Sequence, residues 1–166
     1  MEDAQVVVIL ASPADRPWGE EIVRALERWG LVGEVRVASA HKTPEHLLRM
    51  LSQYESDGRP HVYITVAGRS NALSGLVDAQ VLSPVIACPP YGEKYAGLDL
   101  LSSLRMPSGV APAVVLEPEN AALLAAKMLA LADPGLREKV RQSQEEQRRR
   151  LLDADAACTQ YAIRNT

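Results

Sequence analysis

The sequence predicts an α/β fold, a three-layer α/β/α sandwich built on a five-stranded parallel sheet. Three observations lead to this prediction. Short apolar runs with the composition of strands alternate with amphipathic helical patterns, no internal repeat or linker interrupts them, and the 166 residues match the length of one domain. Strands separated by helices imply right-handed crossovers, which give a parallel sheet covered on both faces.

The first strand is expected at residues 6–10, a continuous apolar run that is β-branched at four of its five positions. Such a run is typical of a strand buried on both faces. A helix is expected from Asp15 onward, because apolar residues recur there at helical spacing until Gly30 ends the pattern. The other strands are expected at residues 34–38, 61–66, 85–88 and 113–116.

The second helix is expected to open at Thr43, an N-cap residue, with Pro44 in the first helical position and an acidic residue in the first turn. Shorter helical patterns occur near residues 71–80 and 97–104. An Ala/Leu-rich helix is predicted at residues 119–132, where the small side chains suit close packing.

Residues 1–132 form the predicted α/β catalytic domain, and residues 133–166 form a C-terminal helical extension, within one domain overall. An apolar stripe that includes Leu136, Val140 and Leu151 indicates a long helix. Its seven basic and six acidic residues balance one another, unlike a nucleic-acid-binding arm. The helix is expected either to lie solvated on the domain's own edge or to pack on a neighbouring subunit. We favour the neighbouring subunit, because a five-stranded domain is complete without the extension.

Composition and charge exclude several classes of protein. Eighteen Lys and Arg against twenty-one Asp and Glu give a net charge of −3, which does not attract nucleic acid or an anionic membrane. No apolar run approaches the ~20 residues of a transmembrane helix. The first residues carry no basic region, so no signal peptide is expected. Cys88 and Cys158 resemble neither a disulfide framework nor a metal knuckle. We therefore expect a soluble, cytoplasmic protein.

The turns after the first three predicted strands are rich in hydroxyl, charged and imidazole groups. Ligands of open parallel sheets bind just beyond the carboxyl ends of the strands, so these turns are expected to share one rim. The polar or flexible residues of the three turns are Ser12 and Asp15, then Ser39, His41 and Lys42, then Ala67, Gly68, Arg69, Ser70 and Asn71.

Several of these residues suit a phosphorylated ligand. Ser12 precedes a helix whose first N–H groups favour an anion, and Lys42 adds a compact positive charge at the start of the next helix. Asp15 has two possible roles, capping its helix or accepting hydrogen bonds from ribose hydroxyls. Gly68 allows the backbone to approach a flat ring closely. Ser70 and the following Asn71 can also be read simply as caps of the third helix.

His41 is the strongest single candidate for chemistry. An unperturbed imidazole titrates at about pH 6.5, so it both takes and gives a proton near neutrality. His46 falls on a helix and His61 opens a strand, so we expect no histidine metal site. A nucleophilic pair of Cys88 with His41 is a minor alternative, because cysteines at strand ends are commonly buried small hydrophobes. The Walker and dinucleotide glycine patterns are both absent.

The turn segments in this order resemble the PurE family, the aminoimidazole ribonucleotide carboxylases and mutases of purine biosynthesis. The resemblance covers residues 5–132 and is strongest at Ser39-Ala-His-Lys-Thr-Pro44, Ala67-Gly-Arg-Ser-Asn71, Cys88-Pro-Pro90 and Met106-Pro-Ser-Gly109. Class II is favoured over class I. Class I members place Arg after the histidine, where this chain has Lys42, and carry a Gly-Gly-Ala-Ala-His-Leu-Pro-Gly turn, where this chain has Gly68-Arg-Ser-Asn-Ala-Leu-Ser-Gly75.

The resemblance implies a flavodoxin-like sheet and direct, reversible carboxylation of aminoimidazole ribonucleotide by carbon dioxide, with no ATP, biotin, other cofactor or metal. It implies that Ser12, Asp15, Ser39 and Lys42 hold the phosphate and ribose. It assigns proton transfer to His41, with Lys42 and Ser70 as further catalytic groups. It places Ala67, Gly68 and Ser70 at the aminoimidazole ring and carbon dioxide, in a substrate site that also includes Arg69 and Asn71.

The resemblance also implies a homo-oligomer, a tetramer or octamer, with residues 106–109 and the C-terminal helix near subunit contacts. One departure concerns the phosphate turn, Ala11-Ser-Pro-Ala-Asp15, where the family has Gly-Ser-x-Ser-Asp. A stiffer first position and one missing hydroxyl bear on affinity more than on activity. The alternatives are a class I mutase that acts on the N-carboxylated ribonucleotide and a non-catalytic ribonucleotide-binding homologue.

Overall fold

The computed structural model describes residues 4–92 and 94–163, and five strands lie within these ranges. They are β1 (Gln5–Leu10), β2 (Val32–Val37), β3 (His61–Val66), β4 (Val85–Ala87) and β5 (Ala113–Val114). Every pairing is parallel, and the order across the sheet is β2-β1-β3-β4-β5. This is the flavodoxin-like strand order, so the predicted fold class is confirmed.

Helices connect the strands in the predicted order. They are α1 (Arg16–Glu27), α2 (Pro44–Glu55), α3 (Ala72–Asp78), α4 (Leu101–Leu104), α5 (Pro118–Leu129) and α6 (Pro134–Ile163), with 3₁₀ turns η1 (Pro13–Asp15) and η2 (Lys94–Leu100). Several expected boundaries need correction. The strand expected at residues 34–38 runs from Val32 to Val37, and the helix expected at residues 119–132 ends at Leu129. The pattern at residues 97–104 splits into η2 and α4, and the last strand is shorter than predicted because its partner β4 ends at Ala87.

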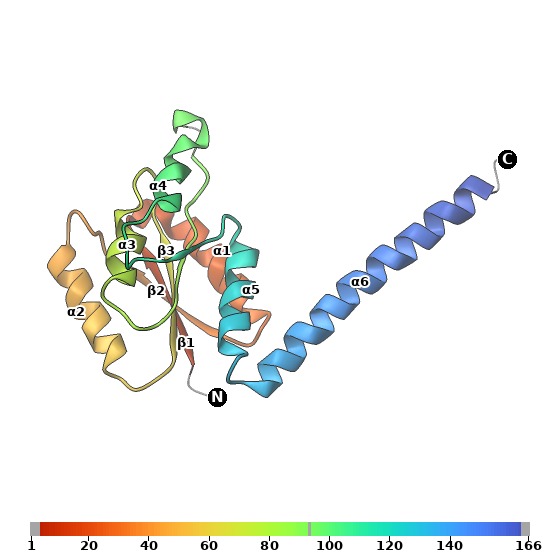
Figure 1. Ribbon diagram of the computed structural model, residues 1–166, viewed down its shortest axis with the longest axis horizontal. Coiled ribbons are helices and arrows are strands. Elements are labelled where there is room, and N and C mark those ends of the chain that lie inside the picture. Colours follow the sequence, from red (N-terminus) through yellow and green to blue (C-terminus); the bar gives the residue numbers. More distant parts are fainter. Residues whose placement is uncertain (1–3, 93, 164–166) are drawn as a thin grey trace.

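Two hydrophobic cores cover the two faces of the sheet. Alternate side chains of β1 and β3 point to opposite faces, so Val6 and Val8 join one core while Val7 and Ile9 join the other. Helices α1 and α5 close the first core, and α2 and α3 close the second (Figure 1). The three-layer arrangement follows directly from strands that are apolar on both faces.

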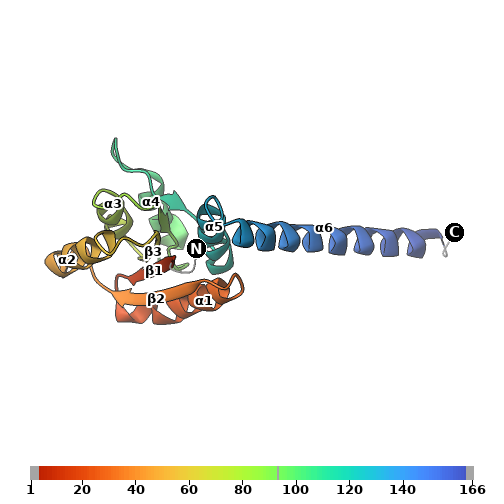
Figure 2. The same ribbon diagram turned by 90° about the horizontal axis from the view of Figure 1, so that it is seen from below.

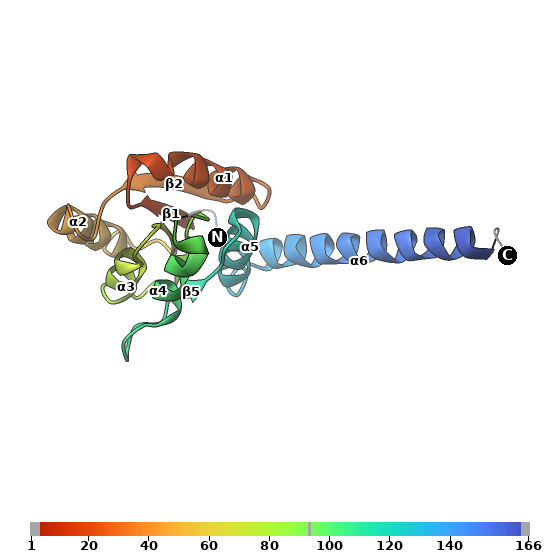
Figure 3. The same ribbon diagram turned by 90° about the horizontal axis from the view of Figure 1, so that it is seen from above.

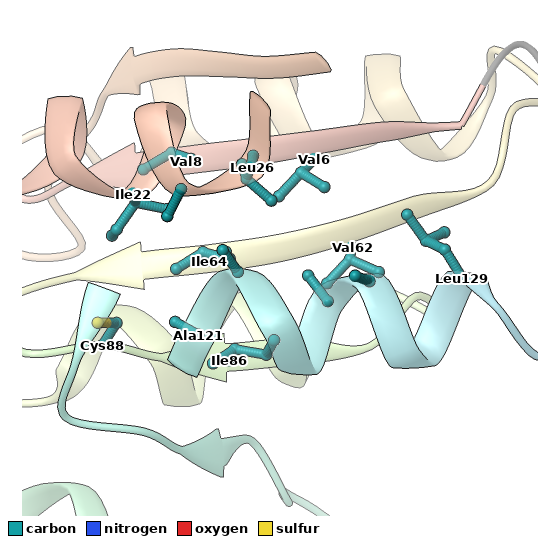
Figure 4. Packing of buried hydrophobic residues seen from close by; sticks show 14 of the residues in the cluster. Val6, Val8, Ile22, Leu26, Val62, Ile64, Ile86, Cys88, Ala121 and Leu129 are labelled. Carbon is teal, nitrogen blue, oxygen red and sulfur yellow. The ribbon is translucent and has the colours of Figure 1, made fainter. Parts of the chain in front are cut away.

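The Ala-rich helix α5 packs as its composition predicts. Ala121, Ala122, Ala125 and Ala126 are completely buried, and Figure 4 shows Ala121 facing the sheet beside residues of β3 and β4. Side chains this small allow the helix backbone to approach α1 and the sheet closely. The core therefore forms without any phenylalanine in the chain.

Helix α6 packs on the domain only through its first turns, where Leu136 and Val140 join the core beneath α5. Beyond them it extends away from the body of the protein (Figures 2 and 3), and residues 145–158 are all exposed. The expectation of a helix lying along the domain's own edge is therefore wrong for this part. No helix within residues 4–92 and 94–163 combines the length and apolarity needed to cross a membrane.

Candidate functional site

The three strands that precede the predicted site residues end in register with one another, at the same edge of the sheet. Leu10 pairs in register with Val37 on one side and with Val66 on the other. The ladder continues one step further, because the Ala11 N–H donates to the Val66 carbonyl (2.9 Å) and the Ala38 N–H donates to the Leu10 carbonyl (3.0 Å). The turns after β1, β2 and β3 therefore begin side by side at the carboxyl edge of the sheet.

A cleft of about 580 Å³ opens at this edge. The connection after β1 runs through α1 on one face, and the connections after β2 and β3 run through α2 and α3 on the other. The chain thus changes direction between β1 and β3, which is where doubly wound sheets bind ligands. The lining residues are Ala11, Ser12, Ala14, Asp15, Ser39, Ala40, His41, Lys42, Ala67, Gly68, Arg69, Ser70 and Leu73.

Nine of the ten predicted site residues line this cleft. Asn71 is the exception, because it is buried and stands outside the lining residues. It occupies the N-cap position of α3 without a side-chain hydrogen bond to the helix, and its buried amide nitrogen has no partner among the described residues. The alternative in which its side chain caps α3 is therefore wrong.

The first turn presents a hydroxyl and a carboxyl to the cleft. Ser12 Oγ accepts a hydrogen bond from the Ala14 N–H (3.2 Å), which caps the short turn η1 and leaves the hydroxyl hydrogen available to a ligand. Asp15 occupies the N-cap position of α1 but makes no side-chain hydrogen bond to that helix, so the capping alternative is wrong. Burial raises the pKa of its carboxyl, partly offset by a backbone hydrogen bond at Ser12.

The second turn is held by hydrogen bonds between Ser39 and the residues that follow it. Thr43 Oγ1 accepts from the Ser39 N–H (2.9 Å), and Ser39 Oγ accepts from the Lys42 N–H (3.2 Å). Thr43 is at the N-cap position of α2 as expected, but its hydroxyl points back to Ser39 and does not cap the helix. This closed turn fixes the backbone on both sides of His41.

His41 is exposed and lines the cleft, so its ring reaches both ligand and solvent. The other two histidines lie elsewhere. His46 is on the surface of α2, and His61 is buried at the start of β3 with its Nε2 2.9 Å from Asp57 Oδ1. In the described part of the chain, no group of three His, Cys, Asp or Glu side chains is placed to hold a metal ion.

The third turn contains a backbone conformation that the sequence gives no reason to expect. Arg69 has φ +67°, in the left-handed region that favours glycine, and the Ser70 N–H donates to the Gly68 carbonyl (2.9 Å). Gly68 lines the cleft and has free space where a side chain would stand. A Cβ placed there would meet only Pro90 Cγ, at 3.8 Å, among protein atoms.

Cys88 lies at the end of β4 and outside the cleft. It is fully buried, and burial raises the pKa of its thiol to about 11. A thiol in this state is protonated at neutral pH and is a weak nucleophile. The alternative of a Cys88–His41 pair is therefore not supported by the geometry.

Sequence patterns did not single out two wall residues, Ala40 and Leu73, because small apolar side chains carry no chemical signal. The cleft as built brings hydroxyls, an ammonium, an imidazole and a carboxyl around an open glycine. These groups can hold a phosphorylated ribose and move a proton beside it. The fold and the cleft thus place the chain among the α/β proteins that carry a ligand cleft at the carboxyl edge of a parallel sheet.

Comparisons with known proteins identify the particular family. The family model described as AIR carboxylase matches residues 5–150. The chain is 52% identical over 154 residues to a phosphoribosylaminoimidazole carboxylase of Archaeoglobus fulgidus, covering 93% of this chain and 84% of that protein. It is 46% identical over 151 residues to the enzyme of that name from Treponema denticola, covering 91% and 95% of the two chains.

A solved structure agrees with these matches. The crystal structure of Treponema denticola PurE superposes with a TM-score of 0.89 at 46% identity, covering 92% of this chain and 97% of that one. The chain belongs to the AIR carboxylase family. Membership makes it an enzyme of the phosphoribosylaminoimidazole carboxylase class, carbon–carbon lyases of purine biosynthesis.

Proposed function

We propose that this chain is a class II enzyme, which carboxylates aminoimidazole ribonucleotide directly with carbon dioxide, reversibly and without ATP, biotin or metal. The observation that carries the proposal is the convergence of three turns on one cleft, with His41 exposed at its rim. The class II assignment is supported by Lys42 after the histidine and by the Gly68–Gly75 segment, where class I members differ.

The ribose and phosphate are proposed to lie between the first two turns. The hydroxyls of Ser12 and Ser39 and the ammonium of Lys42 would surround the phosphate. The Asp15 carboxyl, which is not used as a helix cap, would accept hydrogen bonds from the ribose hydroxyls. Holding a charged phosphate far from the reacting carbon orients the base without changing the chemistry there.

The aminoimidazole ring is proposed to lie against the third turn, with Ala67 and Gly68 on its flat face. Arg69, which the resemblance includes in the substrate site, lines the cleft at the centre of this turn, whereas Asn71, which it also includes, is buried behind it. Ala67 and Gly68 both line the cleft, and Gly68 adds no side chain to fill it. A ring stacked on backbone atoms there would present its carbon 4 toward the rim that carries His41.

The reaction needs one reversible proton carrier. Carbon 4 is enamine-like, so its electron pair forms the new bond to the carbon of carbon dioxide. The resulting sp3 carbon carries both a hydrogen and a carboxylate, and His41 would remove that proton so that the ring regains its aromaticity. Lys42 and the Ser70 hydroxyl would stabilise the developing carboxylate charge. In the reverse direction, protonated His41 returns the proton and carbon dioxide leaves.

The deciding experiment incubates the purified protein with aminoimidazole ribonucleotide and bicarbonate in the absence of ATP. Formation of the carboxylated ribonucleotide supports the proposal. Consumption of only the N-carboxylated isomer would favour the class I mutase. Binding of the ribonucleotide in calorimetry with no turnover of either compound would favour a non-catalytic homologue. The altered Ala11–Asp15 turn is the observation that favours this alternative.

We further propose that the enzyme is a cytoplasmic homo-oligomer, a tetramer or octamer, in which α6 packs on a neighbouring subunit. Leu151 and Leu152 on α6 are 73% and 70% exposed, and residues 145–158 are all exposed to solvent. Leu101 and Leu104 on α4 are also exposed. Leucines exposed in this number are typical of surfaces that a partner covers. Gel filtration with light scattering would give the number of subunits.

A further inference from the structure

The turn proposed to face the aminoimidazole ring is strained and does not hold its shape by itself. Gly68, Arg69 and Ser70 form a three-residue turn closed by the Ser70 N–H and the Gly68 carbonyl, with φ +67° at the central Arg69. Tight turns with a positive central φ are rare and strained, and a residue with a Cβ is disfavoured in this region. Some other part of the protein must keep Arg69 in place.

The end of η2, which contains Asp99, and the short helix α4, which contains Ser102, supply two further hydrogen bonds. Asp99 Oδ2 accepts from the backbone N–H of Arg69 (3.1 Å), and Ser102 Oγ accepts from the backbone N–H of Asn71 (3.1 Å). Ser102 in turn donates its hydroxyl to the carbonyl of Asp99 (2.8 Å), which fixes the two acceptors relative to each other. Together with the bond from the Ser70 N–H to the Gly68 carbonyl, these contacts satisfy three successive N–H groups.

Asp99 and Ser102 stand outside the substrate cleft. They line a smaller cavity of about 100 Å³, and Ala67 and Arg69 are common to both spaces. The contacts that connect Asp99 and Ser102 to the cleft are therefore their hydrogen bonds to the turn and the residue that follows it. The acceptor atoms lie about 30 residues further along the chain than the N–H groups they bind.

We propose that Asp99 and Ser102 are positioning residues of the carboxylation site. By accepting the N–H groups on either side of Ser70, they hold Arg69 in its left-handed conformation and aim the Ser70 hydroxyl and the Gly68 backbone at the ring and the incoming carbon dioxide. This role rests on the function proposed above, because it concerns the turn assigned to the ring.

The experiment compares Asp99→Ala with Asp99→Asn and with a matched control, Asp78→Ala. Asparagine keeps an oxygen that can accept from the Arg69 N–H. Asp78 Oδ2 accepts a similar backbone hydrogen bond, from Ala111 (2.7 Å), but does not contact the cleft or the turn. The Ala variants at positions 78 and 99 therefore lose comparable hydrogen bonds, of which only one supports the substrate-facing turn.

For each variant, kcat, KM and calorimetric affinity for aminoimidazole ribonucleotide are measured. We expect Asp99→Ala to lose about 10- to 100-fold in kcat/KM and to bind the ribonucleotide more weakly, since misplacement by about 1 Å has effects of this size. Asp99→Asn and Asp78→Ala should each stay within a few-fold of the parent enzyme. Equal losses in Asp99→Ala and Asp78→Ala, or no recovery in Asp99→Asn, would overturn the assignment.

If Asp99→Ala does not fold, the pair Ser102→Ala and Ser102→Thr decides. Threonine retains the hydroxyl, so we expect loss with alanine and recovery with threonine, and full activity of Ser102→Ala would overturn the assignment. The proposed function can fail separately. A parent enzyme that binds the ribonucleotide without carboxylating it refutes the carboxylase proposal, while the affinities of the variants still test the positioning role. Absence of any binding refutes both.

Discussion

The hydroxyl of Tyr63 donates a hydrogen bond to the Glu55 carboxylate at a distance of 2.9 Å, and neither residue lines the cleft. Glu55 also accepts from the Leu82 N–H (2.9 Å) and the Ser83 hydroxyl (2.8 Å). One carboxylate at the end of α2 therefore connects β3 with the loop that precedes β4. Burial by itself would raise the pKa of Glu55, but these three donors together lower it.

Glu55→Gln is expected to destabilise the protein at neutral pH by about 1–3 kcal/mol, because hydrogen bonds to a charged acceptor weaken when the charge is removed. A lowered folded-state pKa contributes stability above the unfolded value of about 4.3, and this contribution is lost as pH falls through the folded value. The variant should therefore unfold at a lower denaturant concentration at neutral pH, and its stability should fall less as the pH is lowered. Denaturant unfolding as a function of pH measures this, with the exposed Glu20→Gln as control. Equal stability of the two variants would contradict it.

His41→Asn is expected to lower kcat by about 10²- to 10⁴-fold while leaving ribonucleotide affinity nearly unchanged, because only the proton carrier is removed. Steady-state assays and calorimetry separate the two effects. His46→Asn is the control, since that histidine is equally exposed but lies on α2 outside the cleft. Near-full activity of His41→Asn would remove His41 from its proposed role.

Asp15→Asn is expected to stabilise the ligand-free protein at neutral pH and to weaken ribonucleotide binding about 10- to 100-fold. Burial raises the pKa of Asp15, so its contribution to stability is full below the unfolded pKa and is lost as pH rises through the folded pKa. Removing the charge restores that contribution at neutral pH, and the gain should vanish in acid. Thermal unfolding at neutral and at acidic pH tests the change in stability, and calorimetry tests the change in ribonucleotide affinity. A less stable variant at neutral pH would show that the backbone hydrogen bond at Ser12 outweighs the cost of burying the carboxylate.

Thiol alkylation is expected to leave a Cys158→Ser variant active. Cys88 is then the only cysteine, and its burial and its raised pKa, about 11, keep it unreactive in the folded protein. Activity before and after iodoacetamide treatment, with mass measurement of labelling, tests this. Rapid inactivation that substrate prevents would revive the Cys88 nucleophile.

Replacing both Leu151 and Leu152 by Glu is expected to reduce the number of subunits or weaken their association, with little change in the fold of the domain. These two side chains make no core contact in their own chain, so any loss must come from a partner. Light scattering over a concentration series measures association, and Arg149→Glu serves as a charge control on the same helix. Unchanged assembly would place the subunit contacts elsewhere.

Much of the fold could be predicted because the strands are buried on both faces. Residues 6–10 and 62–66 are continuous runs of apolar or β-branched residues, and the limits predicted for the two strands agree with β1 and β3 to within a residue. The edge strand β5 was predicted too long, since its end is set by the length of β4 and not by its own sequence. Capping was also misjudged at Asp15 and Thr43, where the side chains have other surroundings.

The sequence alone determined which side chains meet at the cleft, because strand ends in a parallel sheet share one edge and the residues just after each strand must gather there. The tertiary structure decided the backbone conformation of the turns that line the cleft. The left-handed conformation of Arg69 depends on Asp99, which lies about 30 residues away in the chain, and no local pattern encodes a hydrogen bond between such distant segments. Local sequence propensity is enough to predict helices and strands. A strained turn persists only when contacts with other parts of the protein hold it in place.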